Sequence, residues 1–308
     1  DCSSRGLGDV YKRQVTVCRN HGDFLEDAIL SLISQGYPNL EYIIVDGGST
    51  DKTPDIIKKY EHHLSWWVSE PDAGPTDALQ KGFAKTTGEI MGWLNADDRH
   101  QVNSLFAIAE IFSQHKNIDW IQGRPTWFNK DGVPLVEMPS SPAMRRYGIH
   151  GEEIQMKWAL WSQMRYLNGD FLAIQQESTF WRRTLWEKAG SHVNTNYKYA
   201  YDMELWARFF RHTELRTVDT ILAGFSMIGE NQISRLGKDG YETEGREIIK
   251  KELQQLSLWQ RINTRLKWKL SRILKPFYYM RIPVLRTIYR KLLGIKSCLL
   301  YTSDAADE

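Results

Sequence analysis

Apolar residues recur along this chain in two alternating patterns, short β-branched runs and stretches with helical spacing. Residues 40–45 (LEYIIV) and 89–94 (EIMGWL) predict buried strands, because each is a short, largely apolar run bounded by turn residues. Residues 24–35 carry apolar side chains three and four positions apart, which predicts a helix with Asp23 as its N-cap. Further strands are expected at 15–18, 64–69 and from 120, and further helices at 53–60, 76–86, 102–115, 184–189 and 202–211. This alternation predicts an α/β fold whose mostly parallel sheet is covered on both faces.

The two ends of the chain look foreign to this pattern. Residues 9–14 (DVYKRQ) and 298–303 (CLLYTS) can be encoded by the two strands of one short DNA sequence, read in different frames. We therefore expect residues 1–14 and 298–308 to be adapter-like and non-native. The remaining stretch, about 283 residues, suits one large domain or a domain with an appendage. Cys18 is its one cysteine, which leaves no disulfide framework and fits a reducing, cytoplasmic compartment.

Charge is divided unevenly along the chain. Residues 15–252 hold 26 basic and 33 acidic side chains, whereas residues 253–297 hold 11 basic and no acidic ones. Helices are expected from residue 240 onward, with breaks at Pro276 and Pro283. Basic helices with aromatic and leucine faces suit an anionic membrane surface, although packing on the acidic body or a dimer contact stays open. No apolar run approaches the ~18 residues that cross a bilayer, and no recognised nucleic-acid module is present, so we expect no nucleic-acid partner.

Carboxylates follow two of the predicted strands. Asp46 comes directly after residues 40–45, and the pair Asp97 and Asp98 comes after the apolar run that ends at Leu94. In α/β sheets, ligands bind at the carboxyl ends of the strands. Two adjacent carboxylates repel each other unless a cation or a hydrogen-bonding ligand lies between them. The pair therefore predicts a divalent metal that holds a diphosphate, although each motif alone also fits a loop aspartate or a helix cap.

Four separated motifs, in order, resemble glycosyltransferase family 2, and the resemblance covers residues 15–234. They are VDGGSTD at 45–51, SEPDAGPTDALQKG at 69–82, NADD at 95–98 and YAYDMELW at 199–206. The resemblance implies the GT-A fold, with a central, mainly parallel sheet in residues 15–239. Residues 240–297 would then form a basic helical appendage.

The resemblance also implies which residues contact the nucleotide-sugar. Asp46 would face the nucleotide base, where a carboxylate suits an N–H of uracil or guanine. Asp72 lies in a stretch beside the nucleotide, and Lys81 can reach a phosphate from the helix that follows. The alternative, that Lys81 is an ordinary solvated lysine on a helix, explains the sequence nearly as well as a phosphate contact does.

The NADD motif takes the place of the family's metal-binding element. Asn95 stands where most relatives carry aspartate, and it can hydrogen-bond a ribose or phosphate without adding charge. Asp97 would bind the metal, Mg²⁺ or Mn²⁺, through oxygen. Asp98 would assist through a water molecule or cap the following helix.

The YAYDMELW motif supplies the candidate general base. Asp202 stands at the family's position for the group that accepts a proton from the acceptor hydroxyl, and it also suits a helix N-cap. Glu204 lies two residues further on, so on a helix it points elsewhere and has a structural interpretation. Residues 175–183 resemble a stretch that shapes the acceptor side, and Glu177 within it is a second candidate acid.

One departure from the family pattern concerns the diphosphate. Relatives often carry FRxH after the last strand, whereas residues 225–234 read FSMIGENQIS, without that arginine or histidine. Glu230 or a residue of the basic tail would have to compensate.

The expected activity is inverting sugar transfer from a nucleoside-diphosphate donor to a glycan or lipid-linked hydroxyl. The resemblance places it in bacterial polysaccharide assembly, peripheral at the inner membrane face, with residues 253–297 against the anionic lipid. Two alternatives stay open: a nucleotidyltransferase, which also uses metal-binding acids, and a non-catalytic protein that binds sugar nucleotides. The donor sugar and the acceptor do not follow from the sequence.

Overall fold

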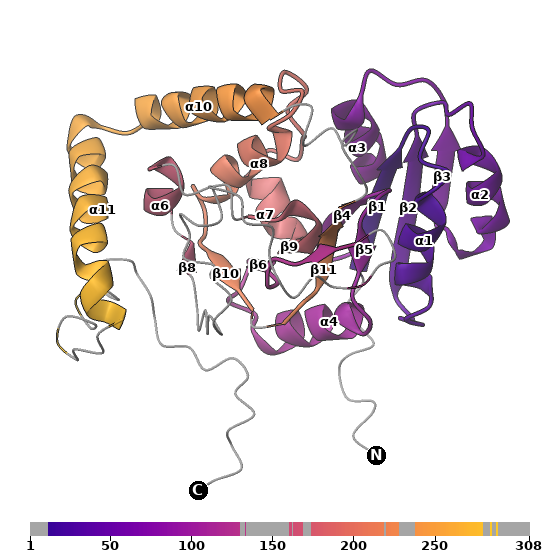
Figure 1. Cartoon of the computed structure of the whole chain (residues 1–308), viewed down its shortest axis with the longest axis horizontal. Helices are drawn as coiled ribbons and strands as arrows, with labels where there is room; N and C mark the ends of the chain where they lie inside the picture. Colours follow the sequence, from indigo (N-terminus) through magenta and orange to yellow (C-terminus); the bar gives the residue numbers. More distant parts are fainter. Residues whose placement is uncertain are drawn as a thin grey trace, which may run out of the picture.

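A computed structural model describes residues 12–129, 133, 160–161, 163–168, 174–218, 220–227, 238–279, 284 and 288. Asp131–Gly132, a dipeptide typical of hairpin turns, and the candidate Glu230 lie outside these residues. The α/β fold is confirmed, with the elements arranged as in Figure 1.

Four parallel strands form one half of the main sheet. They are β1 (Lys12–Cys18), β2 (Leu40–Asp46), β3 (Trp66–Ser69) and β4 (Ile90–Asn95). They lie side by side in the order β3-β2-β1-β4. Burial of both faces explains why β2 and β4 are largely apolar rather than alternating.

Four further strands complete an eight-stranded sheet in the order β3-β2-β1-β4-β9-β6-β10-β8. These strands are β9 (Thr179–Arg182), β6 (Trp120–Gln122), β10 (Leu215–Thr217) and β8 (Leu160–Trp161). β9 runs antiparallel to both β4 and β6, so the sheet is mixed on this side. A small second sheet joins β5 (Arg99–His100), β11 (Ala223–Ser226) and β7 (Trp127–Phe128).

Helices cover both faces of the main sheet. On one face lie α1 (Leu25–Ile33), α2 (Thr53–Lys59) and α4 (Ser104–Gln114), which share a core cluster with Ile44 and Leu94. On the other face lie α3 (Pro75–Ala84), α7 (Arg183–Lys188) and α8 (Tyr201–Phe209), which share a cluster with Val15 and Val45. The remaining short elements are η1 (Glu61–His63), α6 (Gln163–Leu167) and η2 (Gln176–Ser178).

Tryptophans fill the centre of the second cluster. Trp93, Trp120, Trp181 and Trp206 are at most 1% exposed, and their rings contact one another or shared aromatic neighbours. A contact between α3 and the sheet is also close: a Cβ on Gly82 would lie 2.5 Å from a methyl group of Val15. Gly82 therefore allows α3 to pack closely on β1.

Two long helices follow the small sheet. In Figure 1, α10 (Lys238–Gln255) runs across the top of the view, and α11 (Leu258–Tyr279) turns away from it at the left. Ile248 of α10 is buried in the same core cluster as Trp206, so α10 packs on the body. The domain boundary expected between residues 239 and 240 stays a prediction. In the part of the chain that the structure describes, no helix combines the length and the apolarity that crossing a membrane requires.

Two local predictions about helix ends are wrong. α1 begins after Phe24, no side chain caps it, and Asp23 instead pairs with Lys52 at 2.7 Å. α11 continues through Pro276 and ends three residues later, at Tyr279. A proline this close to the end of a helix removes a single N–H and leaves few following turns to disturb.

The first strand begins earlier than the apolar pattern indicates. β1 starts at Lys12, because backbone pairing with β2 and β4 does not depend on the side chains. The side chains of Arg13 and Gln14 fit this position poorly. Arg13 is ion-paired with Glu41, yet none of its buried guanidinium nitrogens has a hydrogen-bond partner among the described residues, and burial lowers its pKa to about 10. The non-native origin of residues 1–14 stays a prediction.

Candidate active site

The candidate site lies where the parallel strands end. Cys18 pairs with Asp46 at the ends of β1 and β2, and Val17 pairs with Asn95 on the other side. Ser69, at the end of β3, pairs with Asp46. The register of the sheet therefore brings Asp46 and Asn95 to one edge, with a single strand between them.

Asp46 is a buried carboxylate held by hydroxyl and amide groups. It accepts hydrogen bonds from the backbone N–H of Ser49 (3.0 Å), from the Ser49 hydroxyl and from the Ser69 hydroxyl (2.6 Å). Gly48, with φ +74°, makes the turn that returns Ser49 to this carboxylate. The Cys18 thiol also donates to Oδ1, at 3.7 Å. A carboxylate has about four acceptor positions, so a ligand N–H would take the place of this weak thiol contact.

Asp72 and Lys81 lie near this loop but in different surroundings. A Cβ on Gly47 would lie 2.6 Å from Oδ2 of Asp72, so Asp72 packs directly against the loop that follows Asp46. The ammonium group of Lys81 lies 3.0 Å from Glu70 and 3.3 Å from Asp77. These two carboxylates hold Lys81 at the surface, which favours its interpretation as a solvated helix lysine.

Asn95 links the NADD motif to the segment before β9. Its amide group donates to Oδ2 of Asp98 (3.2 Å) and to Oε1 of Gln176 (3.1 Å). Gln176 in turn donates to the carbonyl of Trp93 (2.6 Å). The side chain of Asn95 thus ties the end of β4 to η2.

Asp98 is fully buried and does not cap the following helix. Its Oδ1 accepts the backbone N–H of Ser226 in β11 (3.0 Å), and Asn103 occupies the N-cap position of α4. The predicted helix-capping role of Asp98 is therefore wrong. Burial raises the pKa of Asp98 well above its usual value, and the nearby charges of Asp97 and Glu177 raise it further.

Glu177, the second candidate acid, is a buried carboxylate of the same site. It lies in η2, and in the described part of the chain its Oε1 is buried with no hydrogen-bond partner. Burial raises its pKa to about 8, and the charges of Asp97 and Asp202 act in the same direction. Glu177 therefore interacts electrostatically with both Asp97 and Asp202, which the family pattern assigns to the metal site and to the general base. In the sequence, Glu177 was marked only by its place in residues 175–183, because no local pattern shows that its side chain is buried.

Asp202 lies in the first turn of α8, two residues after the N-cap Ala200. It is therefore not the N-cap itself. Its Oδ1 accepts the backbone N–H of Met203 (2.7 Å), and its Oδ2 accepts the hydroxyl of Tyr241 in α10 (3.4 Å). Burial raises the pKa of Asp202 to about 7, against the opposing effect of these hydrogen bonds. A general base works best when its pKa lies near the operating pH.

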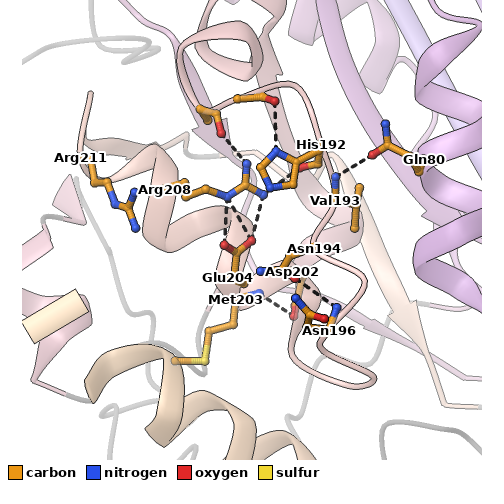
Figure 2. A network of polar contacts seen from close by, with 12 residues as sticks. Gln80, His192, Val193, Asn194, Asn196, Asp202, Met203, Glu204, Arg208 and Arg211 are labelled. Carbon is orange, nitrogen blue, oxygen red and sulfur yellow. Dashed lines mark hydrogen bonds and ion pairs between the residues drawn. The ribbon is translucent and has the colours of Figure 1, made fainter. Parts of the chain in front are cut away.

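Glu204 has a structural role, in agreement with its interpretation from the sequence. Figure 2 shows its carboxylate facing Arg208, with N–O distances of 2.9 to 3.1 Å. Arg208 also donates to the carbonyl of His192 (2.8 Å), so the pair fastens α8 to the preceding loop. The carboxylate of Glu204 is engaged by Arg208, and its surroundings differ from those of Asp202.

Four carboxylates therefore act on one another at this edge: Asp97, Asp98, Glu177 and Asp202. Asp97 is half-buried beside Asp98 in the segment after β4, whereas Glu177 lies in η2 and Asp202 in α8. Within the described ranges, no group of three or more His, Cys, Asp or Glu side chains is arranged to hold a metal ion by itself. Mg²⁺ commonly takes one or two carboxylates and completes its coordination with substrate phosphates. The half-buried Asp97 suits such a site better than Asp98, which is fully buried and accepts hydrogen bonds from Ser226 and Asn95.

Comparison with known proteins supports the same assignment. The family described as Glycosyl transferase family 2 matches residues 15–158. An uncharacterized glycosyltransferase of Rickettsia typhi is 27% identical over 197 residues, covering 62% of this chain and 56% of the relative. Poly-beta-1,6-N-acetyl-D-glucosamine synthase of Staphylococcus epidermidis is 28% identical over 118 residues, covering 38% of this chain and 29% of the relative. The matched part of the chain thus spans 56% of the length of the first of these relatives and 29% of the second.

Solved structures resemble the fold over most of the chain. S. aureus TarS 1-349 in complex with UDP-GlcNAc has a TM-score of 0.63 at 16% identity, covering 92% of this chain and 80% of TarS. The mannosyltransferase PcManGT of Pyrobaculum calidifontis, in complex with GDP-Man and Mn²⁺, has a TM-score of 0.52 at 14% identity, covering 92% and 86%. At such identities the likeness concerns the fold alone, and it confirms the expected GT-A architecture. The match to the family model identifies residues 15–158 as a glycosyltransferase family 2 domain, in agreement with the motifs and the curated relatives.

Proposed function

We propose that this chain transfers a sugar from a nucleoside-diphosphate donor to a hydroxyl group of a glycan or lipid-linked acceptor, with inversion at the anomeric carbon. The observation that carries the proposal is the placement of Asp202, with its pKa raised to about 7, beside a carboxylate cluster that follows β4. Sugar transfer needs a proton acceptor and a site for a diphosphate together, and this edge of the sheet offers candidates for both.

Asp202 acts as the general base in this proposal. The acceptor hydroxyl gives its proton to the Asp202 carboxylate as its oxygen attacks the anomeric carbon. The bond from that carbon to the diphosphate oxygen breaks, and the nucleoside diphosphate leaves from the opposite face. A pKa of about 7 makes Asp202 a stronger base than an exposed aspartate, while a substantial fraction stays ionised near neutral pH.

The donor is held by residues at the ends of β2 and β4. Asp46 accepts an N–H from the base, with Asp72 beside the same loop, and Asn95 hydrogen-bonds the ribose or a phosphate. Asp97, assisted by Asp98, would hold Mg²⁺ or Mn²⁺, because oxygen ligands suit these ions and a cation relieves the repulsion among the carboxylates. When bound, the ion supplies positive charge to the departing diphosphate.

Release of nucleoside diphosphate is the experiment that tests this function. The protein is incubated with UDP-, GDP- and dTDP-sugars and Mn²⁺, with and without short glycan acceptors. We expect one donor to yield its nucleoside diphosphate, and the rate to rise with a suitable acceptor. Formation of pyrophosphate from a nucleoside triphosphate and a sugar phosphate would favour a nucleotidyltransferase instead, and saturable donor binding without any product would favour a non-catalytic binding protein.

The helix α11 supports a peripheral membrane location. Its large apolar side chains are 42–72% exposed and recur every three or four residues, which places them on one side of the helix. These residues are Trp259, Ile262, Leu266, Leu270 and Ile273. Five basic residues and no acidic one share the helix up to Ile273. An exposed apolar stripe on a basic helix suits an anionic lipid surface, with ~1 kcal/mol from each nearby basic residue.

Sedimentation with vesicles tests the membrane proposal. Leu266→Glu with Leu270→Glu is expected to weaken binding to phosphatidylglycerol-containing vesicles by at least about tenfold, because two buried apolar contacts become charges. Gln254→Glu with Gln255→Glu is the matched control, since it adds the same charge at exposed positions just before α11. Equal sedimentation of the two double variants would show that the apolar stripe does not contact lipid.

A further inference from the structure

Helix α10 contacts the segment that leads into α8. The carboxylate of Glu244 accepts the backbone N–H groups of Lys198 (3.0 Å), Tyr199 (2.8 Å) and Ala200 (2.8 Å). Ala200 is the N-cap of α8, and an alanine side chain cannot accept a hydrogen bond. Glu244 therefore fixes the backbone just before the turn that carries Asp202.

Tyr241 lies three residues before Glu244 and so on the same side of α10. Its hydroxyl donates to Oδ2 of Asp202 at 3.4 Å. Burial raises the pKa of Tyr241 well above its usual value, which keeps this hydroxyl protonated and able to donate. The helix also approaches closely, since a Cβ on Gly240 would lie 2.5 Å from the ring of Tyr199.

The other end of α10 is anchored beyond the end of α8. Glu252 is buried and pairs with Arg211, with 3.0 Å between Oε2 and Nε. Ile248 packs into the core cluster that contains Trp206 of α8. α10 thus holds the backbone before α8, contacts the carboxylate in its first turn and pairs with a residue after its end.

We propose that α10 is part of the catalytic apparatus, with Tyr241 as the positioning residue that orients the Asp202 carboxylate and Glu244 as the anchor that sets the start of α8. This inference rests on the proposed role of Asp202 as the base. It gives the helix that connects the enzyme body to α11 a function in the reaction. Nothing in the four family-like motifs assigns a role to residues 238–255.

The ionisation of Asp202 depends on groups from four elements. Tyr201 lies beside it on α8, Tyr166 faces it from α6, Glu177 from η2, and Tyr241 and Glu244 from α10. The hydrogen bond from Tyr241 favours the carboxylate form and lowers its pKa, whereas the charge of Glu244 raises it. Loss of the Tyr241 hydroxyl is therefore expected to raise the pKa of Asp202 and to move the acid limb of the rate profile to higher pH.

Tyr241→Phe tests the inference on the full chain. We expect kcat to fall about threefold to tenfold, as for loss of one hydrogen bond of ordinary net strength, because the 3.4 Å contact is long. The donor KM is expected to stay unchanged and the acid limb to move to higher pH. Tyr197→Phe is the matched control, because its hydroxyl also contacts α10, at Lys251 (2.9 Å), but not Asp202. Thermal unfolding of both variants reports any general loss of stability.

The outcomes separate this inference from the proposed function. Suppose that the unaltered protein is active and Asp202→Asn is inactive. An unchanged pH–rate profile in Tyr241→Phe would then overturn the positioning role of Tyr241 and leave the proposed function intact. An unaltered protein that releases no nucleoside diphosphate, or a fully active Asp202→Asn, would overturn the proposed function and this inference with it. A shifted profile in Tyr241→Phe but not in Tyr197→Phe supports the inference.

Discussion

Replacing Asp202 by asparagine is expected to lower kcat for sugar transfer by about 10²- to 10⁴-fold, with the donor KM nearly unchanged. The amide keeps the shape of the side chain but cannot take the proton of the acceptor hydroxyl. In the unaltered protein, kcat/KM is expected to fall as the pH drops below about 7, because Asp202 must be ionised and burial raises its pKa to that value. The residual activity of the Asp202→Asn variant is expected to lack this fall in kcat/KM below pH 7.

Steady-state rates from pH 5 to 9, measured by release of nucleoside diphosphate, check this prediction. Asp55→Asn serves as a control, because it makes the same chemical change at an exposed position on α2. Glu177→Gln is the informative comparison, since Glu177 has a raised pKa in the same cluster. If Glu177→Gln abolished the acid limb and Asp202→Asn did not, the base would be Glu177.

Replacing Asp97 by asparagine is expected to lower metal-dependent transfer by at least about 100-fold, because charge on the departing diphosphate loses its stabilisation. A second readout does not require activity. With UDP present, Mn²⁺ at 100 times its dissociation constant stabilises the folded protein by about 2.7 kcal/mol, and the variant is expected to lose most of this increase in Tm. The cause is the loss of a carboxylate ligand from a cluster whose charges repel one another.

Thermal unfolding with Mn²⁺ and with EDTA, with and without UDP, measures the second readout. The Asp55→Asn variant again provides the control for removal of a surface charge. An Asp97→Asn protein that keeps both its turnover and its Mn²⁺-dependent Tm shift would remove Asp97 from the metal site.

The sequence predicted the sheet and the strand-end residues well for a physical reason. Residues 40–45 and 89–94 are apolar because both faces of β2 and β4 are buried, so the polar residues that follow, Asp46 and Asn95, mark where those strands end. The family-like spacing then placed Asp202 at the start of a helix, and α8 begins one residue before it. Local pattern and strand order were sufficient for these assignments.

Other parts of the site depend on contacts that leave no local signal. Asp98 accepts a hydrogen bond from Ser226, 128 residues away, so its predicted capping role was overridden by tertiary structure. Glu177 is distinguished by burial, and Tyr241 by a contact that folding forms across 39 residues. A lone carboxylate or tyrosine in a sequence carries no sign of such an environment, since the partners come from other elements.

The stereochemistry of the first product tests the central claim most directly. The claim is that one donor lies at the ends of β2 and β4, with Asp202 on the acceptor side and the diphosphate on the other. Once the donor is known from the release assay, proton NMR of the glycoside formed early in the reaction reports the configuration at its anomeric carbon. We predict the configuration opposite to that of the donor, and a product that retains the donor's configuration would contradict the account.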